Sequence, residues 1–180
     1  MKRTEWFERK FPLIEDNGLM PAIIARLAGT AARIEELVGS LDSLILELKP
    51  EGKWSIKEEI GHLVDMEPLW FGRVEDVINN ELELRMADLT NRKTHEANHN
   101  ATDIKILTGQ FREERARLVA GLDRLPDQQL FNSALHPRMK IPMRIIDHAY
   151  FIAEHDDHHL AAIREILLNV ESSLSGFPVG

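Results

Sequence analysis

The stretch HAYFIAEHDDHH, residues 148–159, has the spacing of an amphipathic helix in which histidines occupy apolar positions. On a period of 3.6 residues, one face of this helix would collect His148, Phe151, Ile152, His155, His159, Ala162, Ile163, Ile166 and Val170. A polar group buried on that face without a partner costs about 1–3 kcal/mol. The pattern therefore predicts a long helix, with Pro142 in its first turn and an end near residue 170, whose histidines are satisfied by another group.

Three other segments, over about 19–47, 55–78 and 103–123, have helical periodicity as well. Ser55 and Glu58 have capping-box spacing, and Pro68 predicts a kink or a broken turn in the middle segment. We also expect a short helix over 4–11, a helical turn within 127–134, a loose tail from Ser172 and no strand. The pattern predicts an all-α protein, an antiparallel four-helix bundle in which a long connection over 80–101 joins the second and third long helices.

Composition limits the class of protein. A chain of 180 residues with 43% apolar residues favours one domain over residues 1–180. The net charge of −8 and the scattered basic residues argue against nucleic acid or a membrane surface as a partner. We expect a cytoplasmic protein, because no apolar run is long enough for a membrane span or a secretory signal. Cysteine is absent, so any thiol would have to come from a small-molecule substrate.

A metal ion would satisfy two of the C-terminal histidines at once. His155 and His159 are four residues apart, so both can direct a ring nitrogen at one cation about 2.0–2.2 Å away. The alternative is a pair of neutral core imidazoles bonded to carboxylates or carbonyl groups. A third ligand would have to come from another helix, and His62 is the best candidate because the first three long helices contain no other histidine. Taken alone, its position on the second long helix favours a structural or exposed residue. Ring nitrogens that share one ion would lie about 3–3.5 Å apart.

Two further histidines and four residues of the second long helix are candidates for supporting roles. We expect His148, two turns before His155, to be a core residue or to support the site indirectly, and His158 to lie at the edge of the helix face. Glu67 is a carboxylate at an apolar position, so it is a catalytic base, a group that supports the metal site through a ligand or a bound water, or part of a salt bridge. Three neighbours on the same helix are candidates for orienting a reactant or lining a pocket: Asp65, Trp70 and Arg73.

His95-Glu96-Ala97-Asn98-His99 matches the H-E-x-x-H motif of zinc proteases. That chemistry requires the motif on one buried helix, whereas the flanking residues here are polar and have no apolar stripe. We therefore discount a protease. The connection over 80–101 is expected to fold over the mouth of the bundle and to contact a substrate.

Two motifs carry a family resemblance. The segment from Lys53 to Asp65, KWSIKEEIGHLVD, followed by Glu67, Trp70 and Arg73, resembles the second-helix signature of the DinB-like superfamily and its YfiT-like predicted metalloenzymes. His136-Pro137 and the segment 151–163, FIAEHDDHHLAAI, are similar to the last-helix motif of that superfamily. The resemblance covers roughly residues 20–170. It implies a four-helix bundle with a divalent metal (zinc, nickel or iron) held at its open end by His62, His155 and His159.

The resemblance also implies an enzyme that acts on a small molecule, either a hydrolase or an S-transferase that uses a low-molecular-weight thiol. A divalent ion with open positions could activate water for the first reaction or a thiol for the second. A homodimer is one expected assembly, and no organic cofactor is expected. The alternative from another class is a non-catalytic helical bundle that binds a metal or a ligand, as a stress-response or interaction module.

Overall fold

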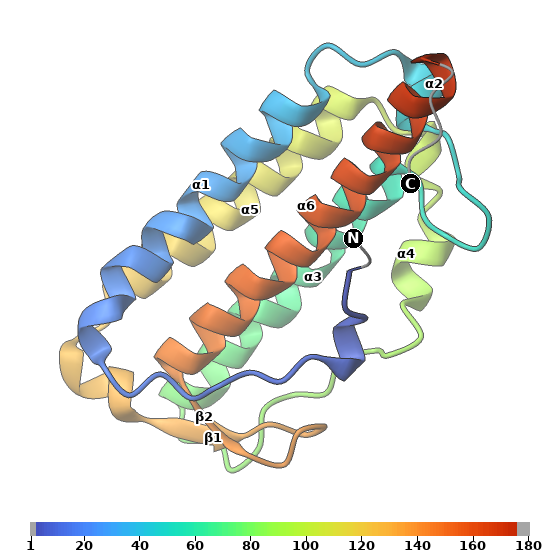
Figure 1. Ribbon diagram of the computed structural model, residues 1–180. Helices are drawn as coiled ribbons and strands as arrows, with labels where there is room; N and C mark the ends of the chain where they lie inside the picture. The colour runs from blue at the N-terminus through green and yellow to red at the C-terminus, as the bar shows by residue number, and fades with distance from the viewer. Residues whose placement is uncertain (1–2, 176–180) are drawn as a thin grey trace.

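The computed structural model describes residues 3–175 and is a four-helix bundle (Figure 1). Its long helices are α1 (Met20–Val38), α3 (Ile56–Ile78), α5 (Ile104–Asp123) and α6 (Ile145–Ser175). Helices α1 and α3 lie at opposite corners, and each packs against both α5 and α6. The colours in Figure 1 show that α1 and α6 run in one direction and α3 and α5 in the other. Within the described residues, no helix combines the length and the apolar composition needed to cross a membrane.

Local capping explains where α3 and α5 begin. The Ser55 hydroxyl accepts a hydrogen bond from the Glu58 backbone N–H at 3.2 Å, and the Glu58 carboxylate accepts one from the Ser55 N–H at 2.9 Å. This reciprocal pair is the predicted capping box. The carboxylate of Asp103 caps α5 by accepting from the Lys105 N–H at 2.8 Å. Helix α3 continues through Pro68, so the turn there is not broken.

The predicted helix over 19–47 is wrong in its last part. Helix α1 ends at Val38, and the short helix α2 (Ser43–Leu46) follows after a turn. Asp42 starts α2 because its carboxylate accepts a hydrogen bond from the Leu44 N–H at 2.8 Å. The break changes which residues face inward: Leu46 is buried, whereas Leu44 is 82% exposed.

The direction of the helices explains the long connection between α3 and α5. Both run the same way, so residues 79–103 must return along the length of the bundle before α5 can begin. This crossover contains α4 (Arg92–Glu96) and the short 3-10 helix η3 (His99–Ala101). Three of its own residues, Leu84, Thr94 and His99, are buried. The crossover is therefore an ordered cover on one side of the bundle.

A β-hairpin joins α5 to α6, and the expectation of no strand is wrong here. Strands β1 (Ser133–Leu135) and β2 (Pro142–Arg144) pair antiparallel, after the 3-10 helix η4 (Asp127–Phe131) that was expected as a helical turn. Pro142 therefore lies in β2 and not in the first turn of α6. The Asp147 carboxylate helps to start α6 at Ile145, because it accepts a hydrogen bond from the Arg144 N–H at 3.0 Å.

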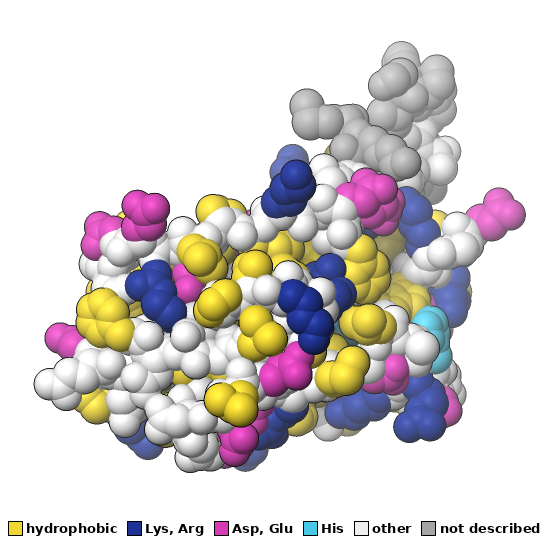
Figure 2. All heavy atoms as spheres, turned by 90° about the horizontal axis from the view of Figure 1, so that it is seen from below, with side chains coloured by type: hydrophobic (Ala, Val, Ile, Leu, Met, Phe, Trp, Pro, Cys, Tyr) yellow, Lys and Arg dark blue, Asp and Glu magenta, His cyan; other side chains and the backbone are white. Residues whose placement is uncertain are grey.

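The ends of the chain also differ from expectation. The predicted helix over 4–11 is reduced to one 3-10 turn, η1 (Trp6–Glu8), in an extended segment that crosses α6 (Figure 1). A second 3-10 turn, η2 (Asn17–Leu19), leads into α1. Helix α6 continues past the predicted end to Ser175, and the rest of the expected tail, 176–180, lies outside the described residues. Figure 2 shows a face on which apolar, acidic and basic side chains intermix.

Candidate metal centre

Three buried histidines from α3 and α6 meet at one point. His62 and His155 are 4% exposed and His159 is 7% exposed. The Nε2 atom of His155 lies 3.4 Å from Nε2 of His62 and 3.2 Å from Nε2 of His159. These distances fall in the range of about 3–3.5 Å expected for nitrogens around one ion. One ligand atom from each residue lies within 4.8 Å of the other two, so the group can hold a metal ion.

The outer nitrogen of His62 is held by a two-step hydrogen-bond chain. Thr94 Oγ1 lies 3.1 Å from His62 Nδ1 and donates its hydroxyl proton to Asp65 at 3.0 Å. A hydroxyl has one proton to give, so Thr94 must accept from His62 Nδ1–H. Nε2 of His62 is then the unprotonated nitrogen and points at the other two histidines. Burial opposes ionisation of Asp65, but hydrogen bonds from His99 and Thr94 bring its pKa below the usual value.

The outer nitrogen of His159 contacts a carboxylate. Nδ1 of His159 lies 2.5 Å from Glu59 Oε2, in a buried pair. Burial raises the pKa of Glu59 to about 8 and lowers the pKa of His159 to about 3. A positive ion at the Nε2 atoms would favour the ionised form of Glu59 and the Nδ1–H tautomer of His159. This is the carboxylate–histidine arrangement by which proteins orient metal ligands.

The donor set fits a divalent transition metal. Burial and the neighbouring histidines lower the pKa of His62 and His155, and burial lowers that of His159, so all three imidazoles are neutral near pH 7. Where the lone pairs of these Nε2 atoms face one another at 3.2–3.4 Å they repel, and a cation between them would remove that repulsion. Three imidazole nitrogens suit zinc, nickel or iron better than calcium or magnesium. Nδ1 of His155 is buried and has no hydrogen-bond partner within the described chain.

A cavity of about 240 Å³ borders the three histidines. All three tryptophans of the chain line it, and all lie close to the imidazoles: the Trp54 ring is 4.8 Å from that of His62, and the Trp6 and Trp70 rings are 5.0 Å and 5.2 Å from that of His155. The walls come from α3, α6, the N-terminal segment, the crossover and the hairpin loop around Pro137. His62 lies about two turns inside α3, so the site is on the side of the bundle, beneath the crossover, and not at its open end.

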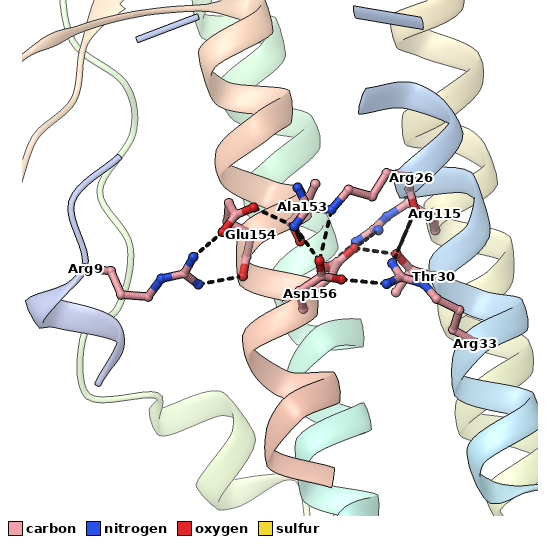
Figure 3. A network of polar contacts seen from close by, with 9 residues as sticks. Arg9, Arg26, Thr30, Arg33, Arg115, Ala153, Glu154 and Asp156 are labelled. Atoms are coloured by element: carbon pink, nitrogen blue, oxygen red, sulfur yellow. Dashed lines mark hydrogen bonds and ion pairs between the residues drawn. The ribbon is translucent and has the colours of Figure 1, made fainter. Parts of the chain in front are cut away.

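Ion pairs on either side of His155 hold α6 in place (Figure 3). Asp156 contacts Arg115 of α5 and accepts a hydrogen bond from Thr30 of α1 at 2.9 Å. Glu154 faces the N-terminal segment and α1, where it pairs with Arg9 and Arg26. These contacts fix the rotation of α6 about its own axis, so that His155, between Glu154 and Asp156, faces His62 of α3.

Comparison with known proteins places the chain in a family. The model of the DinB superfamily matches residues 18–163. The chain belongs to the DinB superfamily. No curated protein sequence matches it.

Two solved structures share the DinB fold. YfiT from Bacillus subtilis, described as a probable metal-dependent hydrolase with an unusual four-helix bundle topology, is 20% identical with a TM-score of 0.79, over 94% of this chain and 95% of YfiT. A protein from Streptococcus pneumoniae is 12% identical with a TM-score of 0.62, over 89% of this chain and 94% of that one. These likenesses confirm the predicted DinB/YfiT-like four-helix bundle.

The structure separates the other candidate residues of this DinB chain. Glu67 is not among the cavity-lining residues, and its carboxylate pairs with buried Arg115 at 2.5 Å. The salt bridge that was its alternative is therefore what the structure contains, and we withdraw Glu67 as a base. His148 is fully buried and its Nε2 lies 3.4 Å from the Trp70 carbonyl oxygen, as a core residue. Of the other candidates, His158, Trp70 and Arg73 line the cavity and Asp65 lies behind His62.

The H-E-x-x-H segment does not form a protease site. Helix α4 ends at Glu96, and Asn98 has a left-handed backbone with φ of 50°, so His95 and His99 lie on separate turns. His95 is exposed, whereas His99 is buried with its Nε2 2.9 Å from Asp65. The segment instead secures the crossover to α3.

Sequence reasoning did not select several residues that touch the three histidines or line the cavity, among them Trp54, Glu59, Thr94 and His136. Glu59 could have been found, because it precedes His62 by three residues and so lies on the same face of α3. Thr94 carries no such signal, since it belongs to a connection without periodicity.

Proposed function

We propose that this DinB protein is a metal-dependent enzyme acting on a small molecule, as a hydrolase or as an S-transferase that uses a low-molecular-weight thiol. The observation that carries the proposal is the convergence of three neutral Nε2 atoms, from His62, His155 and His159, on one point beside a cavity. Three protein ligands leave coordination positions free, which is typical of catalytic and not of structural sites. YfiT, the similar structure described as a probable metal-dependent hydrolase, supports the same class.

The chain supplies the binding and orientation in this proposal. His62, His155 and His159 hold the ion, while Thr94 and Glu59 fix the rings of His62 and His159. When bound, a divalent ion would supply Lewis acidity, which polarises an oxygen or a sulfur atom of a reactant. The indole rings around the site exclude water and so strengthen every electrostatic interaction within it.

Activity with and without metal tests the proposal. The protein, loaded with zinc, nickel or iron(II), is assayed against a panel of esters and amides and against a panel of electrophiles with low-molecular-weight thiols. We expect turnover in at least one panel, loss of turnover with chelator, and loss in His155→Ala. The matched control is His95→Ala, which removes an exposed histidine outside the cluster.

Full activity in the chelated protein would overturn the metal-dependent mechanism. Metal binding without turnover in either panel would favour the alternative, a non-catalytic metal-binding bundle. Circular dichroism of each variant confirms that the helices remain, so that loss of turnover is not loss of fold.

A further inference from the structure

A buried arginine in the cavity wall lacks a counter-ion. Arg73 of α3 is 2% exposed and lines the cavity, and no carboxylate within residues 3–175 lies at ion-pair distance from it. Its Nε donates to the backbone oxygen of Arg85 at 3.1 Å. The nearby carboxylate of Asp76 is already taken by Arg85, which donates to it from its backbone N–H at 2.8 Å and from its guanidinium. A buried charge normally has a partner, so an anion from outside the chain would complete this site.

His136, from the hairpin loop, adds a second donor at the same place. Its Nδ1 accepts hydrogen bonds from the backbone N–H groups of Arg138 and Met139, both at 3.2 Å. The proton of the neutral ring is therefore on Nε2. Nε2 lies 3.3 Å from Nη1 of Arg73, which can only donate. Two N–H donors thus face each other in the cavity wall, and neither satisfies the other.

The other side chains that line the cavity do not neutralise the positive charge of Arg73. Arg138 also lines the cavity, with its guanidinium 5.1 Å from the Phe7 ring and without an ion pair in the described chain. Among residues 3–175, two carboxylates line the cavity, and both are engaged elsewhere. Glu59 is bonded to His159, and Asp88 accepts from the backbone N–H groups of Thr90 at 2.9 Å and of Arg92 at 3.0 Å.

We propose that Arg73, His136 Nε2–H and Arg138 form a subsite for an anionic oxygen group of the substrate, a carboxylate or a phosphate. The inference rests on the proposed function, because it assigns a substrate class to the same cavity. An anion would accept hydrogen bonds from both opposed donors and neutralise a buried charge. The Trp70 ring lies 5.7 Å from Arg73 Cζ and 5.2 Å from the His155 ring. An apolar body that covers Trp70 would therefore connect the anionic group to a reacting group at the three histidines.

Tryptophan fluorescence is a direct reporter, because Trp6, Trp54 and Trp70 are the only tryptophans and all line the cavity. Phenylacetate, phenyl phosphate and the neutral phenylacetamide are titrated into the full chain, once with chelator and once loaded with zinc. We expect at least one anion to bind about tenfold or more tightly than the amide in both metal states, since hydrogen bonds between charged groups are the stronger ones. A preference for one anion alone assigns carboxylate or phosphate.

Substitutions locate the preference. Arg73→Met is expected to reduce the affinity for the anion to that for the amide, and Arg73→Lys to retain part of it. Arg138→Met, at a half-buried position, is expected to reduce the affinity for the anion by a smaller factor than Arg73→Met does. It also serves as the second test should Arg73→Met fail to fold. The control Arg117→Met removes an arginine whose side chain is 60% exposed and should leave all affinities unchanged.

Three results would overturn the subsite. They are equal affinity for the anions and the amide, absence of binding by all three ligands, and an unchanged preference for the anion in both Arg73→Met and Arg138→Met. The titration with chelator distinguishes failure of the subsite from failure of the proposed function, because it measures anion binding without a metal. An arginine-dependent preference that persists in protein without turnover would support the subsite and contradict the enzyme. Metal-dependent turnover without any preference for anions would support the enzyme and contradict the subsite.

Discussion

At the scale of single residues, the orientation of His62 depends on a threonine that is distant in the sequence. The Thr94 hydroxyl accepts a hydrogen bond from His62 Nδ1–H and donates one to Asp65, so that Nε2 of His62 faces the other histidines. The partner of a ligand's outer nitrogen fixes both its tautomer and its orientation. Metal affinity should therefore depend on residues that never touch the ion.

Thr94→Val tests this dependence, because valine keeps the shape of threonine and removes the hydroxyl. We expect zinc affinity to fall about 10–100-fold, as for other partners of metal-ligating histidines. Competition with a chromogenic chelator measures the dissociation constant. Thr90→Val, at an exposed position of the same crossover, is the control. Unchanged affinity in Thr94→Val would show that the hydroxyl does not orient His62.

Also at this scale, buried His148 predicts a pH dependence of stability. Burial and the nearby charge of Arg73 lower the pKa of His148 from 6.5 to about 3. Above pH 6.5 the ring is neutral in both the folded and the unfolded chain, so the titration of His148 takes nothing from the unfolding free energy there. As pH falls below 6.5 the unfolded chain takes up a proton that the folded protein refuses, and stability decreases by up to about 1.4 kcal/mol per pH unit until about pH 3.

Urea unfolding of wild type and His148→Leu between pH 7 and pH 4 measures this contribution. The difference in unfolding free energy between the two proteins should change in favour of the variant as pH falls, because leucine takes up no proton. Other groups titrate in both proteins and cancel in the difference. A difference that is constant with pH would mean that His148 takes up its proton equally in the folded and the unfolded chain, so that its pKa is not lowered by folding.

At the scale of elements, the crossover is attached to α3 through a close contact that requires glycine. A Cβ at Gly61 would lie 2.2 Å from Cγ of His99, so any side chain there must displace that ring and its bond to Asp65. Gly61→Ala should lower the unfolding free energy by about 1–3 kcal/mol, the usual cost of overpacking. The matched control is Gly29→Ala in α1, where nothing lies within 4 Å, and there we expect a gain of up to about 1 kcal/mol. Equal effects of the two substitutions in urea unfolding would contradict this contact.

The polar layer between α1, α3, α5 and α6 is a second contact at this scale. Arg115 pairs with Glu67 and Asp156, and both carboxylates are buried. Arg115→Met would leave two buried acids without their cation, so we expect a loss of about 3–5 kcal/mol in unfolding free energy. Arg117→Met, two residues along α5, should change stability by less than about 1 kcal/mol because its ion pairs are exposed. A small loss in Arg115→Met would show that the layer does not hold α6.

Elements with several turns could be predicted from the sequence, whereas most of the short ones could not. The C-terminal histidines were found from periodicity, because His155 and His159 lie on one face of a long helix. His62 needed the family resemblance, since its own helix gave no reason to prefer a ligand over an exposed residue. The hairpin was missed because each strand has three residues, too few for an alternating pattern. The partner Thr94 depends on the path of the crossover, which tertiary packing determines.

At the scale of the whole molecule, the direction of the helices creates the site. Because α3 and α5 run the same way, the chain must cross the bundle between them, and it does so over α3 where His62 lies. The N-terminal segment crosses α6 and brings Trp6 against His155. The N-terminal segment, the crossover and the hairpin loop thus cover the three-histidine cluster that α3 and α6 provide, and no helix-packing pattern identifies these segments.

Metal stoichiometry after equilibrium dialysis against zinc, followed by elemental analysis, tests the central claim most directly. We expect one zinc ion per chain in wild type and in His95→Ala, and a loss of that ion in His62→Ala and in His155→Ala, with helical content retained in all four proteins. Wild-type protein without zinc, or a His62→Ala variant that binds zinc as wild type does, would contradict the three-histidine centre.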